Sequence, residues 1–140
     1  MSRLRAALAG VAAAGVWAAV EPLDRRVLRH DYSDIAMLGK LVTRSAAWPL
    51  AGVAVHAVNG AAFGLAFDRA RSRTGVGPQR LALGLALAEN FALFPLAAVV
   101  DRLHPARGER GLAPLFTTRG LAQATFRHAL FGAVLGRLAR

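Results

Sequence analysis

Mostly apolar stretches alternate with charged connections along this chain. Four stretches approach the roughly 20 residues that a helix needs to cross a bilayer: 4–23, 46–67, 81–100 and 120–139. A soluble helix normally carries a polar stripe at 3.6-residue spacing, but the second stretch has only His56 and Asn59 as strongly polar residues. The last stretch contains Gln123, Arg127 and His128 and is the least apolar. The pattern predicts an all-α integral membrane protein, a four-helix bundle; a soluble helical bundle is the alternative.

The connection between the first two stretches has a helical pattern of its own. Apolar residues recur there at Ile35, Leu38, Leu41 and Val42, and Ser33 stands where a helix N-cap would be. This predicts a short amphipathic helix lying on the membrane interface. An ordinary structured loop is the alternative.

The first stretch also resembles a secretory signal. Arg3 and Arg5 precede its apolar core, and the small residues Ala18 and Ala19 follow it. We expect a retained helix that runs on past Pro22, because this stretch takes part in an internal repeat.

Two segments of the chain match each other at a constant spacing. HAVNGAAFG, which begins at His56, aligns with HALFGAVLG, which begins at His128, 72 residues later. The first and third stretches pair more loosely at an offset of 77 residues, with Arg3 matching Arg80. We therefore predict one membrane domain, residues 1–140, built from a duplicated two-helix hairpin. The repeats cover about 1–72 and 78–140, and a pseudo-two-fold axis along the membrane normal would relate them.

Glycines recur every four residues within the repeated motif. Such spacing places small residues on one helix face, where they allow close packing in membranes. We expect the second and fourth stretches to meet through these faces, with the packing residues Gly52, Gly60, Gly64, Gly132 and Gly136.

Composition narrows the function classes. The formal charge of +10 would suit nucleic acid, but the basic residues lie between the apolar stretches, as loop charges do, and no nucleic-acid-reading motif is present. The absence of cysteine excludes disulfide scaffolds and thiol catalysis. We expect a multi-pass protein of the cell inner (plasma) membrane. Its partners would be the lipid bilayer and, through the glycine faces, a second copy in a homodimer, with no nucleic acid.

Polar residues gather at one depth of the predicted spans. Ionisable groups inside a membrane usually face the bundle interior or a wet cavity. This midplane layer consists of His56, Asn59, Glu89, Asn90, Arg127 and His128. In one interpretation, Glu89 and Arg127 form a buried ion pair that only fixes helix register. In another, Glu89 and the histidines exchange protons or ions, assisted by a backbone carbonyl that Pro95 would free.

Two further alternatives stay open. Haem b could be ligated by His56 and His128; no other cofactor, no metal and no catalytic residue are predicted. A small membrane enzyme acting on a lipid head group could instead use the acidic and histidine residues of one loop side, although solvated loop charge is the simpler explanation. These residues are Glu21, Asp24, His30, Asp31, Asp34, Asp101, His104 and Glu109. An enzyme is the less favoured class, because their spacing matches no metal or nucleophile motif.

Four stretches carry a resemblance to a known group. They are EPLDRRVLRHDYSDIAMLGKLVTR, HAVNGAAFG, PLAAVVDRLHPARG and QATFRHALFGAVLG, which together cover most of the chain. The chain resembles a group of small bacterial membrane proteins with four spans and no assigned activity. The resemblance implies the fold and the location only.

Overall fold

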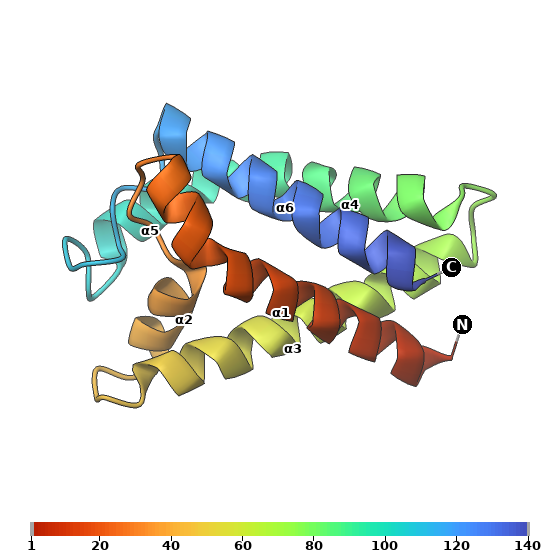
Figure 1. The fold of residues 1–140 in the computed structure, drawn as a ribbon, viewed down its shortest axis with the longest axis horizontal. Helices are drawn as coiled ribbons and strands as arrows, with labels where there is room; N and C mark the ends of the chain where they lie inside the picture. The colour runs from red at the N-terminus through yellow and green to blue at the C-terminus, as the bar shows by residue number, and fades with distance from the viewer. Residues whose placement is uncertain (1, 140) are drawn as a thin grey trace.

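The computed structural model describes residues 2–139, which form helices joined by loops, with no strand. Four long helical segments run back and forth: α1 (Arg3–Val27), α3 (Trp48–Arg71), α4 (Pro78–Leu93) with its continuation, and α6 (Thr118–Leu138) (Figure 1). The short helix α2 (Asp34–Val42) lies at one end with two long connections. Both termini and the connection between α3 and α4 lie at the other end (Figure 1).

Three of these segments are long and apolar enough to cross a membrane. They are α1, α3 and the continuous segment Pro78–Leu103, judged by length and composition. The fourth predicted span is also a helix, α6, but it is not among them. Its buried polar residues Gln123 and Arg127 lower its apolar character.

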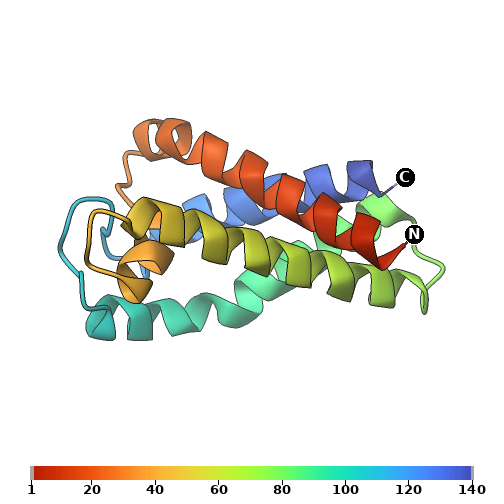
Figure 2. The ribbon, with the colours of Figure 1, turned by 90° about the horizontal axis from the view of Figure 1, so that it is seen from below.

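The third long segment bends at Pro95. Helix α4 gives way there to a 3-10 turn, η1 (Phe94–Leu96), and then to α5 (Ala97–Leu103) (Figure 2). Proline lacks the backbone N–H that an α-helix needs and its ring crowds the carbonyl one turn earlier, which explains the change. Helix α1, by contrast, continues past Pro22 to Val27, as expected.

The short helix predicted in the first connection is confirmed. Helix α2 begins at Asp34, and the Ser33 side chain caps it by accepting a hydrogen bond of 3.0 Å from the backbone N–H of Ala36. Its Gly39 lies against the backbone of Trp48, so α2 packs closely on the start of α3. Its position relative to a membrane interface stays a prediction.

The glycine faces pack, but not on each other as we expected. A Cβ at Gly60 would lie 2.7 Å from the Cβ of Ala14 on α1, and one at Gly132 would lie 2.8 Å from the Cα of Leu83 on α4. Gly64 likewise faces α1 and Gly136 faces α4, while Gly52 faces Ile35 of α2. The prediction that the second and fourth stretches meet through these glycines is therefore wrong. Gly60 and Gly64 instead pack α3 on α1, and Gly132 and Gly136 pack α6 on α4.

The helix pairing leaves one side of the fold loosely closed. Helix α3 packs on α1 and α2, and α6 packs on α4 and α1, whereas α3 and α4 touch at few positions. An alanine-rich face of α1 and the side chains of Phe67, Phe131 and Leu135 fill the centre. The space between α3 and α4 holds the candidate site.

Candidate functional site

Arg127 is the most deeply buried charge of the described chain, with 1% of its side chain exposed. Its guanidinium donates two hydrogen bonds to Asp24, from Nε to Oδ2 at 2.6 Å and from Nη2 to Oδ1 at 2.7 Å. It also donates to Asp34 Oδ2 at 2.6 Å and to the carbonyl oxygen of Tyr32 at 2.9 Å. Such a forked arrangement, with four hydrogen bonds to three residues, is how a low-dielectric interior tolerates a permanent charge.

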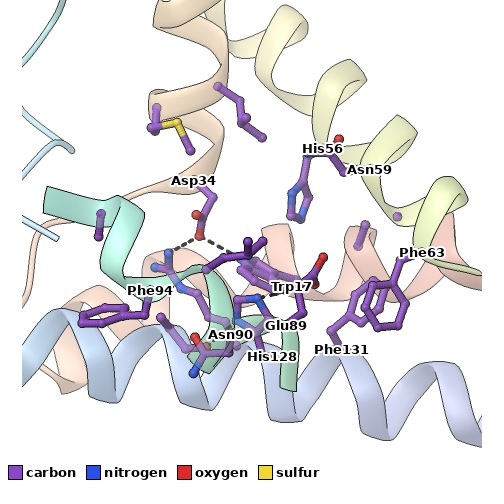
Figure 3. A pocket seen from close by; sticks show the side chains of 18 of the residues that line it. Trp17, Asp34, His56, Asn59, Phe63, Glu89, Asn90, Phe94, His128 and Phe131 are labelled. Carbon is purple, nitrogen blue, oxygen red and sulfur yellow. Dashed lines mark hydrogen bonds and ion pairs between the residues drawn. The ribbon is translucent and has the colours of Figure 1, made fainter. Parts of the chain in front are cut away.

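The carboxylates around Arg127 are themselves held in place. Glu21 accepts hydrogen bonds from Ser33 Oγ at 2.6 Å and from the backbone N–H of Asp34 at 2.8 Å, and it lies 3.6 Å from the guanidinium. The indole N–H of Trp17 donates to Asp34 at 3.1 Å (Figure 3), and Gln123 donates to Asp24 at 2.8 Å. The network therefore ties α1, α2 and α6 together.

The predicted ion pair between Glu89 and Arg127 does not form, and each residue has other partners. Arg127 points toward the end of the fold that holds α2, where Asp24 and Asp34 reach it. Glu89 lies on a more open face, with 42% of its side chain exposed, and its Oε2 is 3.8 Å from Nε2 of His128. The sequence placed all these groups at one depth, but it could not show which way a long arginine side chain would lie.

An aromatic ring separates the two repeat-related histidines. The centroid of Trp17 lies 5.2 Å from that of His56 and 4.8 Å from that of His128, both edge-on, and Figure 3 shows the indole between the two imidazoles. Nδ1 of His128 is 2.8 Å from the carbonyl oxygen of Ala124. Because a carbonyl only accepts, we assign the proton of the neutral ring to Nδ1, which leaves Nε2 directed at Glu89.

A pocket of about 710 Å³ opens between α3 and α4 beside these groups. It brings together all six residues of the predicted polar layer: His56, Asn59, Glu89, Asn90, Arg127 and His128. Asn90 lies at the contact between α4 and α6, where its side-chain amide donates a hydrogen bond of 3.0 Å to the Thr125 hydroxyl. Further polar groups come from Asp34 of α2, Gln123 of α6, the Tyr32 hydroxyl and the Trp17 indole.

The sequence analysis assigned Glu21, Asp24 and Asp34 to a loop side and did not identify Trp17 or Tyr32 as site residues. Trp17, Glu21 and Asp24 lie at positions i, i+4 and i+7 of α1 and share its buried face. This spacing was a signal that the acidic residues belong to the bundle interior rather than to the following loop. Tyr32 and Asp34 offered no comparable signal, because the loop that carries them reaches the site only through tertiary packing.

The haem alternative does not fit the described residues. An iron ligated by His56 and His128 would lie between the two imidazoles, where the Trp17 indole is packed against both. That indole is 7% exposed and hydrogen-bonded to Asp34, so it is a fixed part of the core. Bringing the histidines onto one iron would require removing it.

The acidic and histidine residues proposed for an enzyme serve the fold instead. Solvated loop charge is the wrong description for the residues at 21, 24, 30 and 104, which are all buried. Asp101 accepts from the backbone N–H groups of Leu115 and Phe116 at 2.7 and 2.8 Å, and His104 Nε2 lies 2.9 Å from the carbonyl oxygen of Met37. Within residues 2–139 no three such side chains are grouped to hold a metal ion.

Two exposed acids of this set are ion-paired on the surface. Hydrogen bonds from Lys40 and Arg44 hold the pKa of Glu109 below its usual value, and hydrogen bonds from Arg25 do the same for the pKa of Asp31. The ion pairs of Glu109 connect the loop that follows α5 to α2 and to Arg44, and the ion pair of Asp31 connects the loop before α2 to α1.

The chain has no match to a known protein family, to a characterised protein or to a solved structure. Its function therefore follows from the geometry of the pocket and of the charged network beside it.

Proposed function

We propose that this protein is a multi-pass integral membrane protein of the plasma membrane, that all four long segments cross the bilayer, and that its pocket exchanges protons. Three segments have the length and composition for crossing, and α6 runs beside α4 over a similar length. Large apolar side chains are also exposed on the outward faces of the helices. Their exposure would be unfavourable in water but not in lipid. They include Leu8, Val16, Leu50, Val53, Val58, Leu65, Phe91, Leu93, Leu96, Val99, Phe126 and Leu138.

The observation that carries proton exchange is the facing pair of Glu89 and His128. Their side chains meet at 3.8 Å on the wall of a pocket at the level of the predicted midplane, with His56 on the opposite wall. At this distance, which is longer than a hydrogen bond, a carboxylate and an imidazole interact electrostatically, so the protonation of each group affects that of the other. Ionisable groups kept inside membrane helices commonly serve proton pathways.

The Arg127 network has a separate, structural role in this proposal. Its guanidinium donates four hydrogen bonds, to Asp24, Asp34 and the Tyr32 carbonyl, and its partners among the described residues do not include Glu89 or the histidines. Arginine keeps its proton throughout the accessible pH range. We therefore propose that Arg127 fixes the register of α1, α2 and α6, while Glu89 and the two histidines gain and lose protons.

We also propose that the bundle is a duplicated hairpin. Gly60 and Gly64 pack on α1 in the same order in which Gly132 and Gly136 pack on α4. The matching pattern of contacts supports the sequence repeat, because each copy would then use its glycines for the same internal contact.

The location is tested by fractionating cells that express the protein. We expect it in the membrane fraction, resistant to alkaline carbonate and released by detergent. Recovery in the soluble fraction would overturn the membrane assignment.

Proton exchange is tested with Trp17 as an internal reporter. The chain has two tryptophans, so a Trp48→Phe variant leaves one indole in contact with His56 and His128. A charge that appears about 5 Å from this ring changes the field at the indole and hence its emission, so we expect the fluorescence to titrate with pH. His128→Gln should reduce the transition, and Glu89→Gln should move its midpoint by about half a pH unit or more.

Glu109→Gln is the matched control, since it removes the same charge from an exposed loop. It should leave the Trp17 titration unchanged. An emission that stays constant between pH 5 and 9, or one that Glu89→Gln and Glu109→Gln affect equally, would refute proton exchange at this pocket.

A further inference from the structure

The pocket between α3 and α4 is far larger than a proton site requires. Its volume of about 710 Å³ lies in the range of small-molecule sites, roughly 300–1,000 Å³. Five of its lining side chains are aromatic: Trp17, Tyr32, Phe63, Phe94 and Phe131. Aromatic faces attract cations and also pack against apolar groups. The lining therefore suits a molecule that is both apolar and positively charged.

The charges around the pocket point to the same class of ligand. Four carboxyl groups surround it or lie directly behind its wall: Glu21, Asp24, Asp34 and Glu89. The only permanent cation among the described lining residues is Arg127, and Asp24 and Asp34 already bind it. Glu89 faces no permanent cation there, only His128. An anionic ligand would therefore find no unpaired permanent cation among the described lining residues.

Three buried polar atoms in the lining lack a hydrogen-bond partner within the described chain. They are Nε2 of His56, the hydroxyl group of Tyr32, which is 2% exposed, and Oε1 of Gln123, which is fully buried. Burial raises the pKa of the Tyr32 phenol above its ordinary value, so the hydroxyl stays neutral. Both oxygens can accept a hydrogen bond, and a buried acceptor without a partner is costly. An N–H group of a ligand could donate a hydrogen bond to them, and a cation without such a group would attract them through its charge.

The rim of the pocket faces outward rather than toward either end of the bundle. Ala62 and Ala66 of α3 and Leu93 and Leu96 of the bent segment line it, and all four are exposed. The bend at Pro95 lies between two lining residues, Phe94 and Leu96. If these segments cross the bilayer, the opening faces lipid. A ligand with apolar substituents would then reach the pocket from the membrane.

We propose that this pocket binds a hydrophobic organic cation, which enters from the bilayer and replaces the proton at Glu89. The inference rests on the proposed proton exchange for its pH dependence, and on size, lining and charge for the binding itself. The other charged or titratable groups that line the pocket are His128 and Arg127 of α6, His56 of α3, Asp34 of α2 and Tyr32 of the loop before α2. Of these, His128 lies against Glu89, at 3.8 Å. Binding should weaken as pH falls, because protons and the cation compete for the same carboxylate.

The test uses tetraphenylphosphonium as the probe and the full chain in detergent or lipid nanodiscs. We expect saturable binding by equilibrium dialysis that weakens at least tenfold in Glu89→Gln and is unchanged in Glu109→Gln. Tetraphenylborate has nearly the same shape with the opposite charge, and it should not compete. Non-saturable uptake, equal competition by the anion, or equal binding by Glu89→Gln would overturn the proposal.

A second pair of variants tests the place of binding without touching a charge. Ala62→Phe narrows the rim of the pocket, whereas Ala54→Phe puts the same group on an exposed position of α3 outside it. Only Ala62→Phe should weaken binding; equal effects would overturn the assignment to this pocket. If Trp17 emission titrates but no saturable binding occurs, this inference fails and proton exchange stands. Saturable, Glu89-dependent binding without titration would refute proton exchange and keep the cation site.

Discussion

Replacing Arg127 by methionine removes the cation that three buried or half-buried carboxyl groups surround. The structure shows what is lost: two hydrogen bonds to Asp24, one to Asp34 and one to the Tyr32 carbonyl, all between 2.6 and 2.9 Å. Removing one partner of a buried ion pair typically costs about 3–5 kcal/mol, because the other charge stays buried and unpaired. That corresponds to a roughly 100- to 5,000-fold fall in the ratio of folded to unfolded protein.

The assay is the folded fraction of purified protein in mixed micelles, followed by far-UV circular dichroism as the proportion of SDS rises. Arg137→Met is the matched control: it makes the same chemical change in the last turn of the same helix, at an exposed position. We expect it to change the free energy of unfolding by about 0.5 kcal/mol or less. Arg127→Lys should lie between the two, since an ammonium keeps the charge but lacks the fork that fits Asp24.

A double substitution separates the ion pair from simple loss of packing. In Arg127→Met, the buried carboxylate of Asp24 has lost its cation and destabilises the fold. Adding Asp24→Asn removes this charge and should recover part of the lost stability. Strict additivity of the two changes would refute the reasoning. So would an Arg127→Met protein that unfolds together with Arg137→Met.

Two other predictions concern packing and pH. Gly10→Ala should push α1 away from α3 and destabilise the fold, because the new Cβ would collide with the carbonyl of Gly60. Gly15→Ala, which has open space around it, should be neutral or slightly stabilising. Equal midpoints of SDS unfolding for the two variants would contradict the close approach of α1 and α3. Burial, followed by the nearby Arg127 charge, lowers the pKa of His30 below its ordinary 6.5. The unfolded chain therefore binds this proton more readily, so the stability contributed by His30 is complete above pH 6.5 and is lost as pH falls through the lowered pKa. His30→Gln should flatten this fall between pH 7.5 and 5; an unchanged slope would contradict the assignment.

Much of the local structure could be read from the sequence, because it depends on neighbours along the chain. Apolar runs of sufficient length predicted the long helices, and the Ser33 cap with its apolar spacing predicted α2. The sequence also pointed to Pro95 as an irregular position, where the 3-10 turn forms. In each case the deciding interactions span only a few residues, within one or two helical turns.

The candidate site depended on contacts that local patterns do not encode. Periodicity showed that Gly60 and Gly132 share small faces with their neighbours, but not that α1 and α4 would cover them. It placed Arg127 and Glu89 at similar depth, yet Arg127 pairs with Asp24, which is 103 residues away. A pattern along one helix identifies the face that needs a partner. Which helix supplies that partner is decided by how all the segments pack at once, and that packing also leaves the pocket open between α3 and α4.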